Sequence, residues 1–114
     1  MQVQAIIKYV HEWMLNYAKT ANSKGFVVGV SGGIDSAVTS TLAAETGLPL
    51  LCIEMPIHQE ANQVSRAQEH IAWLKNNYSN VSSINVELTN IFDTFIDTVP
   101  DVKDGENYLR SLVN

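Results

Sequence analysis

Hydrophobic residues at the start of the chain recur with the spacing of an amphipathic helix. The apolar positions follow one another in steps that fit a helical repeat: Val3, Ile6, Ile7, Val10, Trp13, Met14 and Tyr17. Such a spacing places apolar side chains along one stripe of a helix. Residues 22–25 are turn formers, so we expect the helix to end before them.

Short apolar runs and helical patterns alternate through the next part of the chain. Residues 26–30 and 50–53 are apolar throughout, as expected of strands covered on both faces, and residues 84–88 alternate like a third strand. Helical patterns follow the strands in turn, at residues 37–46, about 60–78 and 91–99, before Pro100. This alternation predicts an α/β fold with a parallel, doubly wound sheet and helices on both faces.

The predicted elements form one domain. It comprises an amphipathic helix at residues 1–22, a βαβαβα nucleotide-binding segment at 26–99, and the start of a linker or further helix at 100–114. In an open parallel sheet, ligands bind outside the carboxyl ends of the strands, where the strand order reverses. The strands that would form the other wall of that crevice are missing, so we expect an incomplete domain.

Composition and charge narrow the class of protein. The 114 residues are 46% hydrophobic and 17% charged, which is typical of a soluble globular domain. A formal net charge of −5 without clustered Lys or Arg disfavours binding to nucleic acid or to an anionic membrane surface. No apolar run approaches the roughly 20 residues that span a bilayer, so we expect a cytoplasmic protein. The single cysteine, Cys52, lies in an apolar strand and is interpreted as a buried hydrophobic residue.

The turn after the first strand carries the candidate chemistry. It consists mainly of small and polar residues: Gly29, Val30, Ser31, Gly32, Gly33, Ile34, Asp35 and Ser36. Glycines let the backbone approach a ligand, and free amides at a helix start form an anion site. An aspartate would repel a phosphate unless a divalent cation bridges the two, so Asp35 is a candidate Mg²⁺ ligand.

Two common nucleotide-binding motifs are excluded for this turn. A Walker A loop needs a lysine, but none occurs between Lys24 and Lys75, and the glycine spacing does not fit the dinucleotide motif G-x-G-x-x-G. The structural alternative is a plain turn in which Asp35 or Ser36 caps the helix. That alternative explains each residue singly but not their grouping, which favours a phosphate site.

Residues 31–36 are similar to the S-G-G-x-D-S loop of the ATP pyrophosphatase (PP-loop) superfamily. Members cleave ATP between its α and β phosphates and use the adenylate to activate a carbon for attack by nitrogen or sulfur. Together with the first helix, Met55-Pro56 and residues 88–93, the loop makes nearly the whole chain resemble the N-terminal half of bacterial NAD synthetases. The resemblance implies a Rossmann-like fold of the adenine nucleotide alpha hydrolase type.

The resemblance also implies an activity. Only about 25 residues precede the first strand, which matches the ammonia-dependent form of the enzyme. That form is a homodimeric C–N ligase that converts deamido-NAD, ATP and ammonia into NAD, AMP and pyrophosphate, with no covalent enzyme intermediate. By position, residues 29–36 would hold the ATP phosphates and then pyrophosphate, and Asp35 would bind Mg²⁺. Met55, Pro56 and His58 would lie beside the adenosine.

Two alternatives to this enzyme stay open. One is a nucleotide-binding module without catalysis, and the other is a different superfamily member, such as a GMP synthetase or a tRNA thiolase. We expect the isolated segment to bind ATP without completing the reaction. Arg66, Glu69 and His70 are interpreted as a solvated surface of the third helix.

Overall fold

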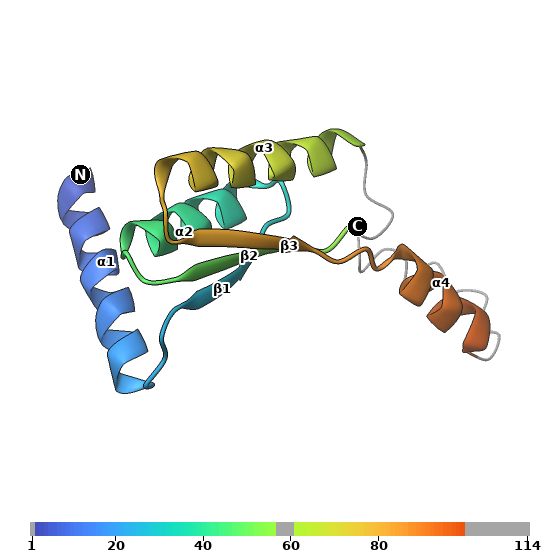
Figure 1. Cartoon of the computed structure of the whole chain (residues 1–114), viewed down its shortest axis with the longest axis horizontal. Coiled ribbons are helices and arrows are strands. Elements are labelled where there is room, and N and C mark those ends of the chain that lie inside the picture. The colour runs from blue at the N-terminus through green and yellow to red at the C-terminus, as the bar shows by residue number, and fades with distance from the viewer. Residues whose placement is uncertain (1, 57–60, 100–114) are drawn as a thin grey trace.

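A computed structural model describes residues 2–56 and 61–99, which form a small α/β layer structure (Figure 1). The elements follow one another as α1 (Val3–Thr20), β1 (Phe26–Gly29), α2 (Ile34–Glu45), β2 (Leu50–Glu54), α3 (Ala61–Asn77), β3 (Val81–Asn85) and α4 (Thr89–Thr98). None of the helices in these ranges combines the length and the hydropathy needed to cross a membrane.

The three strands form a parallel sheet in the order β1-β2-β3. Phe26 pairs with Leu50, and Leu50 pairs with Val81, so the strands start in register. The carboxyl ends of the strands therefore meet at one end of the sheet, where ligands bind in folds of this type. Among the described strands, β1 pairs only with β2, and its other edge is free.

The core lies between the sheet and two helices. Figure 1 shows α2 and α3 on the same face of the sheet. The buried hydrophobic residues of this layer are Val30, Ala43, Ala44, Leu50, Cys52, Ala67, Ile71, Leu74 and Val81. Cys52 is fully buried, as predicted, and its burial raises the pKa of the thiol.

The opposite face of the sheet is open in the described part of the chain. Val27 and Ile84 are 64% and 47% exposed on this outer face, and Leu51 and Ile53 are half-buried. The α/β class and the parallel sheet are confirmed, but the described crossover helices cover one face rather than both. Strands added in one direction through right-handed crossovers place successive helices on the same face, which explains the difference.

Helices α2 and α4 and strand β3 begin earlier than the sequence pattern predicts. Helix α2 begins at Ile34, inside the glycine turn, and β3 begins at Val81 rather than Ile84. The Asn80 amide anchors the start of β3, because it donates to the carbonyls of Ala44 (3.0 Å) and Leu48 (2.7 Å). The predicted strand at residues 84–88 overlaps β3 at Ile84 and Asn85. The next residue, Val86, still bonds to β2, because its N–H donates to the Glu54 carbonyl at 2.7 Å.

The apolar stripe of α1 is mostly not part of the core. Only Ala18 of this helix is buried, whereas Trp13 is 55% exposed. Instead, the first half of the stripe lines a groove of about 560 Å³ against α2. His11 Nε2 lies 3.0 Å from the Glu45 carbonyl oxygen and connects the two helices at the end of α2.

Candidate functional site

The predicted phosphate loop connects the end of β1 to the first turn of α2. Val30 follows β1, is buried, and donates its N–H to the Ile53 carbonyl at 2.9 Å. Ser31, Gly33, Ile34 and Asp35 are exposed. The structure therefore anchors the start of the loop in the sheet and presents its remaining residues at the carboxyl end of β1.

Two serine hydroxyls hold the loop in shape. The Ser31 N–H donates to Ser36 Oγ at 3.1 Å, and the two hydroxyl oxygens lie 3.3 Å apart. The Gly33 N–H donates to Ser31 Oγ at 3.3 Å, and Ser36 Oγ donates to the Gly33 carbonyl at 3.3 Å. These bonds make a compact loop whose hydroxyl groups lie beside the start of α2.

The first turn of α2 has no side-chain cap. Gly33 is its N-cap residue, so the alternative in which Asp35 or Ser36 caps the helix is wrong. Backbone amides in a first helical turn have no partner within the helix, and together with the helix dipole they attract an anion. The loop and helix start thus provide donors of the kind that bind phosphate.

Gly32 is required by the contact between the loop and α3. Its φ of +88° lies in the left-handed region that favours glycine. A Cβ atom at this position would clash with the Gln63 carbonyl oxygen and would lie 3.5 Å from the Ala67 nitrogen. In this structure the close approach that Gly32 permits is therefore to the backbone of α3.

Asp35 lies in the first turn of α2 with an exposed side chain. The described residues include no group of three or more His, Cys, Asp or Glu side chains able to hold a metal ion. Mg²⁺ commonly takes one or two carboxylates and completes its coordination with phosphates and waters, so a lone Asp35 is compatible with it. A carboxylate here also complements the positive end of the helix dipole, which is a structural reason for the same residue.

The end of β2, which carries the predicted adenosine residues, lies beside the loop. A Cβ atom on Gly29 would lie 3.7 Å from Met55 Cε, which places the Met55 side chain next to the start of the loop. Met55 is 46% exposed, whereas Pro56 is buried. His58 lies outside the described residues.

A cavity beside the loop brings in two residues that the sequence interpretation left on a solvated surface. Its volume is about 260 Å³, and its lining is Val30, Gly32, Gly33, Ile34, Ala37, Arg66 and His70. His70 is half-buried and its Nε2 lies 2.8 Å from Ser40 Oγ, so the interpretation of His70 as solvated is wrong. Burial lowers the pKa of His70, partly opposed by a hydrogen bond to the backbone of Ala37.

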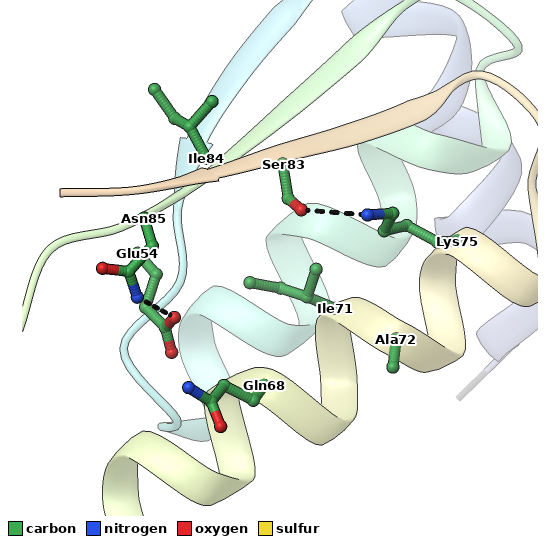
Figure 2. Close-up of a pocket in the computed structure, with 8 residues that line it drawn as sticks. All are labelled: Glu54, Gln68, Ile71, Ala72, Lys75, Ser83, Ile84 and Asn85. Carbon is green, nitrogen blue, oxygen red and sulfur yellow. Dashed lines mark hydrogen bonds between the residues drawn. The ribbon is translucent and has the colours of Figure 1, made fainter.

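A second cavity lies between α3 and the ends of β2 and β3 (Figure 2). It measures about 240 Å³, with Glu54 at one end and Lys75 towards the other. Glu54 is 6% exposed; its Oε1 accepts a hydrogen bond from Asn85 Nδ2, while its Oε2 has no partner among the described residues. The Glu54 carboxylate thus faces α3 and β3, so this cavity is separate from the loop.

Comparison with known proteins places the loop in a family context. The family described as NAD synthase matches residues 6–111. The NH3-dependent NAD synthetase of Malacoplasma penetrans is 35% identical over 107 residues, which are 93% of this chain and 42% of that protein. The enzyme of the same name from Mesoplasma florum is 32% identical over 96% of this chain and 43% of its own length. The chain therefore spans less than half the length of these curated relatives.

Solved structures give the same result for the fold. The NH3-dependent NAD synthetase from Campylobacter jejuni, solved with a nitrate ion, matches with a TM-score of 0.76 and 28% identity, over 99% of this chain and 51% of that one. The NMN synthetase from Francisella tularensis matches with a TM-score of 0.78 and 26% identity, over 86% of this chain and 40% of that one. Both similarities extend well beyond the loop.

Proposed function

Because this chain belongs to the NAD synthase family, we propose that it is the ATP-binding part of an ammonia-dependent enzyme that converts deamido-NAD into NAD. In this reaction the nicotinate carboxylate attacks the α-phosphorus of ATP, pyrophosphate leaves, and ammonia then displaces AMP. The observation that supports this role is the uncapped helix start of α2, which follows a serine-glycine loop at the carboxyl end of β1.

The loop residues have a defined task in this proposal. The amides of the first turn of α2 bind phosphate oxygens and then the departing pyrophosphate. The Ser31 hydroxyl adds a donor on the same side of the loop, while Ser36 Oγ, 3.3 Å from it, holds the loop in shape by accepting from the Ser31 N–H and donating to the Gly33 carbonyl. Stabilising negative charge with fixed donors and aligning the reactants are general sources of rate enhancement in phosphoryl chemistry.

Asp35 would hold Mg²⁺ together with the phosphates. The ion would neutralise part of the negative charge of the phosphates. The chain itself has a formal net charge of −5 and supplies few cationic side chains for this purpose. Met55 and Pro56 would lie beside the adenosine, since Met55 is next to Gly29 at the start of the loop. A cytoplasmic homodimer also belongs to this proposal, and the apolar groove between α1 and α2 supports a role for that surface in assembly.

A second product is possible within the same chemistry. The similarity to the structure named NMN synthetase makes amidation of a mononucleotide the second candidate. The similarity in fold to these two structures does not discriminate between the two substrates. Binding of ATP without any turnover would instead favour a nucleotide-binding module.

A substrate panel separates these candidates. The product of the complete reading frame is incubated with ATP, Mg²⁺ and ammonium chloride, and with deamido-NAD, nicotinate mononucleotide or XMP in turn. Pyrophosphate release is measured, and the amidated product is identified by mass spectrometry. We expect release and NAD formation with deamido-NAD. Preference for the mononucleotide or XMP would replace the proposed substrate, and ATP binding without release on any substrate would exclude catalysis.

A further inference from the structure

Arg66 lies on the part of α3 that contacts the phosphate loop. The close approaches to Gly32 come from Gln63 and Ala67, which precede and follow Arg66 on this helix. Arg66 lines the cavity of about 260 Å³ together with the backbone of Gly32 and Gly33. The loop and this side of α3 therefore enclose one space.

The position of α3 against the loop is held from a second point. His70 is one helical turn beyond Arg66, and residues four apart lie on the same helix face. His70 Nε2 and Ser40 Oγ are 2.8 Å apart, and Ser40 is fully buried in α2. The helix that carries Arg66 is thus tied to the helix whose first turn forms the phosphate site.

Arg66 has no partner of its own in the structure described. Its guanidinium makes no ion pair or hydrogen bond within residues 2–56 and 61–99, although Glu69 is three residues further along α3. It is also the only Lys or Arg between Lys24 and Lys75 in the sequence. The loop contains no lysine, so any cationic side chain for a triphosphate must come from elsewhere in the fold.

We propose that Arg66 is a side-chain ligand of the triphosphate bound at the loop. A guanidinium presents paired N–H donors that match two phosphate oxygens, and it stays charged at any physiological pH. Arg66 would supply from α3 the positive charge that a loop lysine supplies in other nucleotide-binding folds. This inference rests on the proposed function, because it needs a triphosphate at the loop.

The test compares three probes on the purified chain: ATP, pyrophosphate and adenosine, each with Mg²⁺, by isothermal titration calorimetry. The variants are Arg66→Met, which keeps the length of the side chain without its charge, and Arg66→Lys, which keeps the charge without the paired donors. Lys75→Met is the matched control, because Lys75 is an exposed cation on the same helix but outside this cavity. Circular dichroism checks that each variant is folded.

We expect Arg66→Met to weaken ATP and pyrophosphate binding about tenfold or more, the loss typical of a charge-assisted hydrogen-bond pair, and to leave adenosine binding unchanged. Arg66→Lys should be intermediate, and Lys75→Met should match the wild type. Wild-type protein that binds ATP no tighter than adenosine would overturn the proposed phosphate site itself. If the wild type binds ATP more tightly than adenosine and Arg66→Met does so to the same extent, only the role of Arg66 is overturned. If Arg66→Met does not fold, Arg66→Lys and Arg66→Gln provide the same comparison.

Discussion

The Ser40 hydroxyl and the His70 imidazole join α2 and α3 through a contact of 2.8 Å between Oγ and Nε2. Ser40 Oγ also lies 2.7 Å from the Ser36 carbonyl oxygen, to which its hydroxyl donates. Because a hydroxyl has one hydrogen, Nε2–H of a neutral His70 is then the donor in the contact between the helices. This contact connects α2, which follows the predicted phosphate loop, to α3, which packs against that loop.

The stability of the protein should depend on the protonation of His70, because its imidazole is half-buried between the two helices. Burial lowers its pKa below the usual 6.5, so the unfolded chain binds a proton more readily than the folded chain. The free energy of unfolding should fall as the pH drops below about 6.5 towards the folded-state pKa. His70→Gln should reduce this dependence. Urea unfolding at pH 7.5 and 5.5 measures the change in the free energy of unfolding, with His11→Gln as the control. An equal change in the wild type and in His70→Gln would exclude the role of His70.

Gly32 and Gly33 should respond differently to alanine. At Gly32 a methyl group meets the Gln63 carbonyl and the φ of +88° is strained for alanine, so we expect Gly32→Ala to cost about 2 kcal/mol or more of unfolding free energy. At Gly33, with a φ of −87°, the nearest atom to a Cβ is Ser31 Oγ at 3.5 Å. Gly33→Ala should change stability by no more than about 0.5 kcal/mol. Equal urea midpoints for Gly32→Ala and Gly33→Ala would show that Gly32 is not in close contact with α3.

Asp35 is expected to affect turnover rather than folding. Its side chain is exposed, so Asp35→Asn should lower the free energy of unfolding by no more than about 1 kcal/mol, the contribution of a carboxylate at a helix N-terminus. In the product of the complete reading frame, the same change should lower Mg²⁺-dependent pyrophosphate release by roughly 100-fold or more, because a carboxylate ligand of the ion is lost. Glu12→Gln, an exposed change on α1, is the control. Full turnover of Asp35→Asn would remove this residue from the metal site.

Glu54 is expected to reduce the stability of the fold. Its carboxylate is 6% exposed and Oε2 has no partner in the described part of the chain, and burying an uncompensated charge is unfavourable. Glu54→Gln keeps an oxygen for the Asn85 amide and removes the charge, so we expect it to raise the unfolding free energy by about 1 kcal/mol. Urea titration at pH 7 measures this, with Glu69→Gln as the surface control. A loss of stability would show that the charge of Glu54 has a stabilising partner.

The elements that position the loop could be predicted because their patterns are local. Apolar runs identified β1 and β2, and helical spacing identified α1 and α3. The predicted start of β3 was wrong. The buried residue of this strand is Val81, whereas the regular alternation of apolar and polar residues lies further along the chain, where Val86 is 38% exposed. That boundary depends on the Asn80 side chain and its contacts with the end of α2 and with the α2–β2 connection, which no pattern within β3 reveals.

The motif predicts the loop as a candidate site, but it does not predict that α3 forms the other side of the cavity beside the loop. Periodicity shows which helical positions are polar, and it does not show which polar positions face another element. Arg66 and Glu69 have equivalent sequence contexts, yet only Arg66 lines the cavity at the loop. The sequence offers one signal for this placement of Arg66. Arg66 lies four residues before His70, in a stretch that contains no other Lys or Arg.

The outer edge of β1, which is unpaired among the described strands, has a practical consequence for work on this polypeptide. An unpaired edge exposes a row of backbone donors and acceptors that can align with a strand of another molecule. On this molecule the edge strand also carries Val27, 64% exposed, beside an apolar outer face. Concentrated samples should therefore aggregate through edge-to-edge β-pairing, and a lysine in place of Val27 is a simple way to improve solubility before any titration.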